Sequence, residues 1–268
     1  DGDGVAGGVY TLAFTTFNSA PLAGTAVIGR VLASEKGPGG TDVPLPGVTI
    51  TVDGQEQSQR AVTAADGTFR LQPAPAGRFF VNVDGRTSPL SAWPAGAYYP
   101  TIGKAWEAET GRTNNLAGGS GVIYLPLVAA GTLQPVSATE ETRVTFPASV
   151  TNANPALAGV EITVPPNALF ADSGTRGGLV GLAPVASDRL PEPLPGGLTH
   201  ALDISIQTSG PQNFDVPVPA KFPNLPDPVT GEKLPPGAKT ALWSFNHDTG
   251  RWEMQGPMTV TPDGEFVV

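Results

Sequence analysis

Glycine and proline interrupt this sequence so often that no long helix fits between them. The chain holds 34 glycines and 29 prolines among 268 residues, and the short runs between them are rich in Val, Ile, Leu, Thr and Phe. Gly and Pro disfavour helix interiors and mark turns, whereas β-branched and aromatic residues favour strands. No stretch of ten residues has the 3.6-residue apolar period of an amphipathic helix. The pattern predicts an all-β protein with many turns.

The apolar content separates this chain from a disordered Gly/Pro-rich segment. Hydrophobic residues make up 40% of the sequence, which is enough buried surface to offset the entropy lost when the chain is ordered. A chain of 268 residues is also long enough for one large or two small domains with their own cores.

Charge and cysteine usage exclude several classes of function. The formal net charge is −9, and no cluster of Lys and Arg is present, so nucleic acid and anionic membranes are excluded as partners. No apolar run is long enough for membrane insertion. Cysteine is absent, which rules out disulfides, thiol catalysis and thiolate metal sites. The sequence starts without a Met or a signal peptide and ends in a strand-like run, so we expect a fragment of a longer chain.

Strand-like runs and turn residues divide the sequence into four parts. Residues 1–24 are interpreted as an N-terminal linker or an extra strand, and residues 25–92 hold five or six short runs that suit a small sandwich. Residues 93–130 concentrate prolines and aromatic rings and are expected to connect the flanking parts. Residues 131–268 return to alternation. We therefore predict an all-β fold of two tandem β-sandwich domains joined by a Pro/aromatic-rich segment.

Residues 29–84 carry four short motifs in order: a Gly in the first strand, Pro-x-x-Gly-Val, Thr-x-x-Asp-Gly-x-Phe and Pro-x-Gly. In this order they resemble the carboxypeptidase regulatory-like (transthyretin-like) domain. The resemblance implies a small β-sandwich that accompanies other modules and usually carries no active site. The Asp66-Gly67 pair of the third motif fits the type I′ turn of a β-hairpin.

The second half carries a further resemblance, in "YYPTIGKAW", "VEITVPPNALFADSG" and "ALWSFNHDTGRWEMQG". These segments are similar to the fibronectin-plug region that follows a transthyretin-like domain in teneurins. They are also similar to a region ahead of tyrosine–aspartate (YD/RHS-type) repeats in large bacterial secreted or surface proteins. No such repeats occur in this sequence. The resemblance implies an extracellular or cell-surface location and, as partners, neighbouring domains of the same parent chain.

Two tripeptides, Asp172-Ser-Gly and Asp248-Thr-Gly, match the type that carries the catalytic aspartates of pepsin-like proteases. Such a site needs both carboxylates close enough to share a proton, in buried loops. Polar residues surround Asp248, and too little chain separates the two aspartates for two lobes. We interpret both as turns. In this interpretation Asp248 lies in a hairpin loop closed by glycine, between strands that carry the side chains Trp243, Phe245, Trp252 and Met254.

Ser244, His247 and Asp248 are the remaining candidates for catalysis. Residues so close together on one hairpin loop do not converge as a catalytic triad must, and the sequence has no Gly-x-Ser-x-Gly motif. His247 and His200 are its two histidines. We therefore expect that this protein is not an enzyme.

Two candidate binding sites remain open. The aromatic residues Trp93, Tyr98, Tyr99 and Trp106 could form a stacking platform for a glycan, or they could pack into the seam between the two sandwiches.

Asp1 and Asp3 supply part of a calcium loop, which takes about six oxygen ligands in full, or they belong to an acidic linker. No other cofactor is expected.

These observations favour a non-enzymatic structural or interaction module of a large extracellular bacterial protein, which could support or seal a YD/RHS-type β-shell. The alternative is a carbohydrate-binding or adhesion module that uses the aromatic residues between 93 and 106.

Overall fold

The computed structural model describes residues 20–89, 95–115, 121–171, 173–210 and 212–268, and these residues are mainly β. Strands β1 to β21 form several sheets in which most pairs are antiparallel, and this confirms the predicted β character. One α-helix of six residues, α1 (Ala148–Ala153), and the 3-10 turns η1 (Pro38–Gly40), η2 (Gly85–Thr87) and η4 (Pro155–Leu157) complete the described elements. Within these residues no helix has the length and apolar character to span a bilayer.

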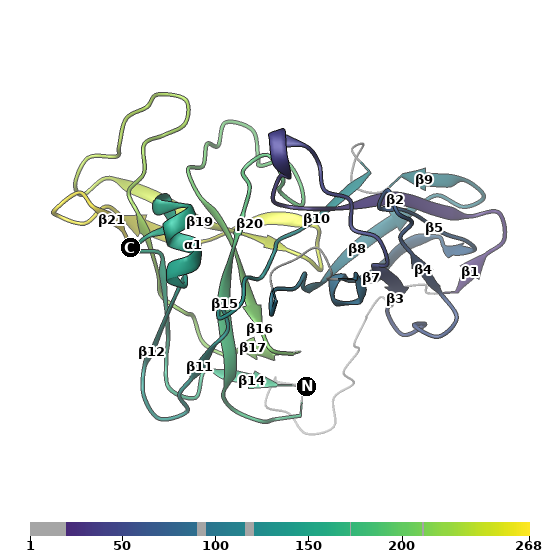
Figure 1. Cartoon of the computed structure of the whole chain (residues 1–268), viewed down its shortest axis with the longest axis horizontal. Coiled ribbons are helices and arrows are strands. Elements are labelled where there is room, and N and C mark those ends of the chain that lie inside the picture. The colour runs from purple at the N-terminus through teal and green to yellow at the C-terminus, as the bar shows by residue number, and fades with distance from the viewer. Residues whose placement is uncertain (1–19, 90–94, 116–120, 172, 211) are drawn as a thin grey trace, which may run out of the picture.

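Two sheets enclose one core in the first half of the chain (Figure 1). One has the order β10-β2-β5, with β9 also paired to β2, and the other has the order β4-β3-β7-β8. Strands β9 and β10 join β2 in parallel, while the other pairs are antiparallel. The strand bounds are β1 (Pro21–Leu22), β2 (Ala26–Ala33), β3 (Thr49–Val52), β4 (Arg60–Val62), β5 (Thr68–Leu71), β6 (Ala74–Pro75), β7 (Gly77–Asp84), β8 (Thr101–Ala108), β9 (Thr113–Asn115) and β10 (Val122–Leu125).

Strand β7 shows how the sequence pattern places side chains in this core. Successive side chains of a strand point to opposite faces, and Phe79, Val81 and Val83 are all buried. Burying a side chain of this size contributes about 1.5–3 kcal/mol. The burial along this strand therefore alternates as its sequence does.

The segment expected to connect the two parts, residues 93–130, instead supplies strands to the first half. Strand β8 pairs with β7 over eight residues, from Thr101 opposite Asp84 to Ala108 opposite Gly77. Strand β10 adds Leu125 to the buried core. The described part of this segment therefore completes the first core. Sequence patterns identify strands but not their partners, so they do not predict the pairing of β8 with β7 or of β10 with β2.

Four further sheets form the second half. Their orders are β11-β15-β16, β12-β13-β18-β21, β14-β17 and β19-β20. A second core lies among the first three sheets, and a smaller one lies where β18 and β21 meet the β19–β20 hairpin. The bounds are β11 (Gln134–Val136), β12 (Thr142–Thr145), β13 (Glu161–Val164), β14 (Leu169–Ala171), β15 (Gly178–Val185), β16 (Asp203–Thr208), β17 (Gln212–Phe214), β18 (Ala220–Pro223), β19 (Lys239–Asn246), β20 (Arg251–Thr259) and β21 (Phe266–Val267).

The hairpin predicted around Asp248 is confirmed as β19–β20. Phe245 lies opposite Trp252 and Trp243 opposite Met254, with a bulge between Leu242 and Trp243. The Phe245 and Trp252 rings meet edge to face, with centroids 5.6 Å apart. Gly250 closes the loop with a φ of 68°. Asp248 therefore lies in a turn.

The hairpin predicted at Asp66-Gly67 is wrong in two respects, and the first is that the flanking strands lie in different sheets. Strand β4 pairs with β3, and β5 pairs with β2. Only Gly67 of the two residues has a positive φ, at 80°, whereas a type I′ turn needs two. The turn packs on β2, where the Gly67 carbonyl accepts a hydrogen bond of 2.8 Å from the Val31 N–H.

We predict that Gly67→Ala destabilises the protein more than Gly54→Ala. Both glycines have a positive φ, at 80° and 73°, which costs a residue with a side chain about 1–2 kcal/mol. A Cβ at position 67 would also lie 2.4 Å from the Val31 carbonyl oxygen, while one at position 54 meets nothing within 4 Å. We expect a total loss of about 3 kcal/mol for Gly67→Ala, at the upper end of common substitutions. Urea denaturation measures both, and equal losses would contradict the packing of this turn on β2.

Candidate functional site

Two of the four aromatic residues proposed as a glycan platform are packed in the first core. Tyr99 is fully buried and Trp106 is 5% exposed. Trp106 stacks on Phe69 with centroids 6.1 Å apart. The pairing of β8 with β7 sets Trp106 opposite Phe79 and so turns its ring inward. These two rings are core residues and offer no face to a sugar.

The other two members of that set are placed differently. Tyr98 is half-buried, with the Arg86 guanidinium 5.4 Å from its ring centroid. Trp93 lies outside the described residues. The structure therefore does not bring the four rings together as an exposed platform within the part of the chain that it describes.

Three acidic residues named from the sequence also lie outside the described residues: Asp1 and Asp3, proposed for calcium, and Asp172. Across the described ranges, no group of three or more His, Asp or Glu side chains is placed to hold a metal ion.

The hairpin loop that holds His247 and Asp248 docks through its main chain on strand β8. The Ala105 N–H donates a 3.0 Å hydrogen bond to the His247 carbonyl, and the Arg78 guanidinium donates to the Asp248 carbonyl. Ser244 accepts a side-chain hydrogen bond of 2.7 Å from Gln255. Because β8 is the outermost strand of its sheet, the loop covers part of an edge that would otherwise be open to pairing.

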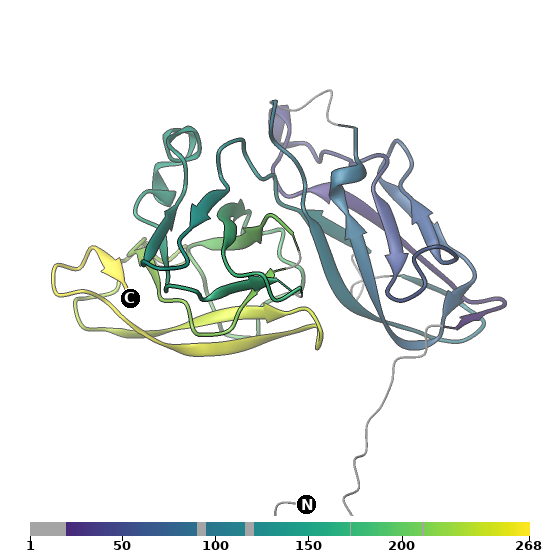
Figure 2. The same ribbon diagram turned by 90° about the horizontal axis from the view of Figure 1, so that it is seen from below.

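Lys104, also on β8, adds side-chain contacts beside this loop. Its ammonium pairs with the Glu192 carboxylate and donates to the Pro191 carbonyl at 3.2 Å. It also lies 5.5 Å from the centroid of the Phe245 ring. The Trp252 indole N–H donates to the Glu192 carbonyl at 3.0 Å. The loop after β15 and the β19–β20 hairpin therefore meet β8 together (Figure 2).

Arg189, in the same loop after β15, is inserted into the first half of the chain. It is only 3% exposed. One guanidinium nitrogen donates to the Ala33 and Glu35 carbonyls at 2.7 and 3.3 Å, and the other donates to the Asp42 carboxylate at 2.5 Å. The guanidinium also lies 5.1 Å from the centroid of the Tyr124 ring. A buried cation thus has carbonyl, carboxylate and aromatic partners, all supplied by residues far away in sequence.

Two weaker contacts flank Arg189. The Ala186 N–H donates to the Ser34 hydroxyl at 3.2 Å, and Lys36 forms an exposed ion pair of 2.9 Å with Asp188. The nearby Lys36 ammonium holds the pKa of the Asp188 carboxyl below its usual range. We define the junction as these contacts of residues 186–192, together with the docking of the hairpin loop on β8.

Glu35 lies beside the junction in a half-buried position. Its carboxylate accepts a hydrogen bond from the buried Tyr99 hydroxyl. Burial raises the pKa of Glu35, and the Tyr99 hydrogen bond and the Arg189 charge oppose that rise only in part. Burial and the Glu35 carboxylate raise the pKa of Tyr99 as well, so its hydroxyl keeps its proton and remains the donor.

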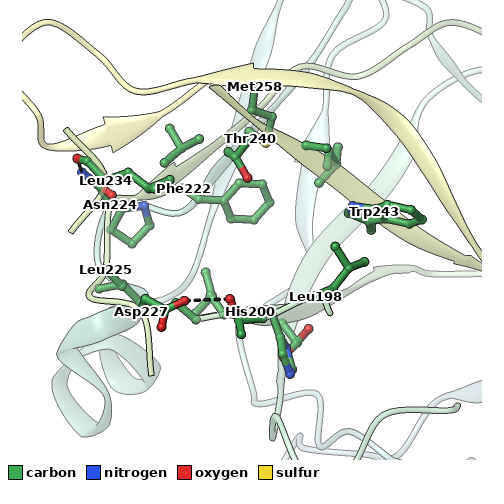
Figure 3. Close-up of a pocket in the computed structure, with 18 of the residues that line it drawn as sticks. Leu198, His200, Phe222, Asn224, Leu225, Asp227, Leu234, Thr240, Trp243 and Met258 are labelled. Atoms are coloured by element: carbon green, nitrogen blue, oxygen red, sulfur yellow. Dashed lines mark hydrogen bonds and ion pairs between the residues drawn. The ribbon is translucent and has the colours of Figure 1, made fainter. Parts of the chain in front are cut away.

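A cavity of about 320 Å³ opens in the second half, between the β19–β20 hairpin and the loops that flank β16 and β18 (Figure 3). Its apolar walls include Phe222, Trp243 and Met258. Three carboxylates share the lining: Asp203, Asp227 and Glu232.

Two of these carboxylates have hydrogen-bond partners in the wall of the cavity. His200 Nδ1 lies 2.5 Å from Asp203 Oδ2, and the Thr199 hydroxyl donates to Asp227 at 2.6 Å. Burial raises the pKa of Asp203, with the adjacent His200 opposing it. Hydrogen bonds from the Thr199 hydroxyl and from nearby backbone N–H groups lower the pKa of Asp227.

Neither the junction nor the cavity can be predicted from the sequence. Arg189 is a single arginine in "VASDRLPEPLPGG", a segment whose prolines and glycines predict only a loop. The cavity residues come from several separate stretches between 194 and 267. Only a three-dimensional arrangement brings them together.

Comparisons of the chain with protein families, with curated proteins and with solved structures find no match.

We predict that Arg189→Ala destabilises the protein by about 2–3 kcal/mol, because buried backbone carbonyls lose their donor and an unsatisfied buried acceptor costs about 1–3 kcal/mol. The change leaves two backbone carbonyls and the Asp42 carboxylate without their donor. Arg112→Ala is the matched control, because Arg112 pairs with Glu109 while both side chains are at least 70% exposed; we expect it to cost no more than about 1 kcal/mol. Urea denaturation measures both, and similar losses would contradict the role of Arg189.

We predict that Glu35→Gln stabilises the protein at neutral pH and has less effect in acid. The folded protein raises the pKa of Glu35 above its ordinary 4.5. The contribution of Glu35 to stability is therefore fully present below that pH and is lost as the pH rises through the folded-state pKa. A Gln side chain keeps an oxygen to accept from Tyr99 but carries no charge to bury.

The measurement is the difference in unfolding free energy between Glu35→Gln and the unchanged protein from pH 4 to 8. This difference should grow with pH and then level off. A constant difference would show that the Glu35 carboxylate has the same pKa in the folded and unfolded states.

Proposed function

We propose that this chain is a non-enzymatic structural module of a large extracellular bacterial protein, built as two tandem β-sandwich domains held in a fixed relation. The observation that carries the proposal is the junction. Arg189 is buried among partners from the first half, and the β19–β20 loop docks on the edge of β8. A flexible tether between two domains would not need a buried, fully partnered arginine.

The family resemblance supports the same proposal. Two sheets around one core, between residues 27 and 125, suit a transthyretin-like domain. The sheets of the second half suit a fibronectin-plug-like domain, which follows the transthyretin-like domain in teneurins. On this proposal the partners are neighbouring domains of the parent chain, and the module supports or seals a YD/RHS-type β-shell. This step is an analogy at the level of the fold.

The placement of the polar candidates supports a role without catalysis. Main-chain carbonyls of His247 and Asp248 take part in docking, and the Ser244 hydroxyl is bonded to Gln255. The burial of Tyr99 and Trp106 argues against the glycan-binding alternative.

A distance measurement between the two halves tests the proposal. The chain has no cysteine, so Gln57→Cys and Val229→Cys would introduce unique labelling sites at exposed positions, one in each half. We expect pulsed electron paramagnetic resonance of spin labels at these sites to give one narrow distance distribution. Adding Arg189→Ala should broaden it, and adding Arg112→Ala should not. A broad distribution in the doubly labelled protein with Arg189 intact would refute a fixed module.

A further inference from the structure

The cavity beside the β19–β20 hairpin shares Trp252 with the junction, and its construction indicates a ligand. Its volume of about 320 Å³ falls at the lower end of the 300–1,000 Å³ that is typical of small-molecule sites. Phe222, Thr240, Trp243 and Met258 line it from strands β18, β19 and β20 (Figure 3). Side chains on paired strands form a more rigid wall than side chains on loops.

The mouth of the cavity is apolar as well. Leu198 and Leu234 both line it, and both belong to the exposed large hydrophobic residues of the described chain, at 37% and 40% exposed. An apolar ligand in the cavity would cover these two side chains and remove their surface from water.

The charged groups that line the cavity are almost all acidic. They are Asp203, Asp227 and Glu232, and no Lys or Arg is among the lining residues. His200 is the one basic side chain in the lining, and its ring nitrogen faces Asp203. An apolar space with this charge balance favours a cation over an anion.

Asp227 is the carboxylate best placed to stay ionised for such a ligand. One oxygen accepts from the backbone N–H groups of Val229 and Thr230, and the other accepts from the Thr199 hydroxyl. These bonds hold the carboxylate in a defined orientation and lower its pKa. An ionised carboxylate has about four lone-pair sites, so the second oxygen can accept a further hydrogen bond from a ligand.

We propose that this cavity binds a small organic cation with an apolar body, such as an arylalkyl amine. The apolar part lies against Phe222, Leu234 and Met258, and the ammonium group faces Asp227. Trp243 adds an aromatic ring, a side chain that attracts cations as well as apolar groups. This inference rests on the lining of the cavity and does not depend on the proposed structural role.

Three probes with the same body and different charge test the proposal: 4-phenylbutylammonium, 4-phenylbutan-1-ol and 4-phenylbutyrate. Isothermal titration calorimetry at low salt and neutral pH should show saturable binding of the ammonium compound. We expect the alcohol to bind about fivefold more weakly, the size of a favourable exposed ion pair, and the carboxylate more weakly still. Added salt should weaken binding of the ammonium compound and leave the alcohol unaffected.

Two variants, Asp227→Asn and Leu198→Arg, test whether the ammonium compound binds in this cavity. Asp227→Asn should weaken ammonium binding about fivefold and leave alcohol binding unchanged, since an amide keeps the oxygen that accepts from the turn. Asp66→Asn is the matched control, because Asp66 also caps an exposed turn, through Thr68, but lies in the first half. Leu198→Arg places a cation at the exposed mouth, and it should weaken ammonium binding and strengthen binding of 4-phenylbutyrate.

The proposal is overturned by any of three results: no saturable binding of the ammonium compound, equal affinity for the ammonium and carboxylate probes, or equal effects of Asp227→Asn and Asp66→Asn. A thermal melt of each variant shows whether it is folded. If Asp227→Asn does not fold, Leu198→Arg decides the test, and unchanged affinities in that variant overturn the proposal.

Discussion

The buried guanidinium of Arg189 is the contact on which the arrangement of this protein depends. Taking such a cation out of water costs several kcal/mol unless its donors are satisfied. Here the planar group meets two carbonyls, the Asp42 carboxylate and the Tyr124 ring. Arginine suits this position because its fork of donors matches several acceptors at once, which a lysine ammonium cannot do. Arg189 thereby fixes the loop after β15 against the end of β2 and the loop that follows β2.

The second constraint is the open edge of β8. An edge strand exposes unpaired N–H and C=O groups that can pair with another chain. In this protein the loop between β19 and β20 covers part of that edge through the His247 carbonyl, and Lys104 adds its contacts to Glu192 and Phe245. The turn residues that resemble a protease motif therefore have a structural explanation: they form a short, tightly closed loop that fits against a strand.

Local patterns predicted the strands well and their partners poorly. The alternation along β7 and the cross-strand order of Phe245 and Trp252 follow from the two-residue period of a strand and from turn chemistry. The parallel pairing of β9 and β10 with β2 does not, because the same strand pattern fits any neighbour with an apolar face. For the same reason the sequence left open whether Tyr99 and Trp106 are exposed or packed. Their burial is set by the register of β8 against β7, and the family resemblance stays a prediction.

The place of β10 has a consequence for how the chain is made. Strand β2 is synthesised early, but it lies between β5 and a strand that ends at Leu125. During synthesis, one edge of β2 and its apolar face therefore stay uncovered until β10 has left the ribosome. Such long-range pairing is slow and exposes the chain to misassociation in the interval. The core of the first half is therefore completed only once β10, far along the chain from β2, has been synthesised.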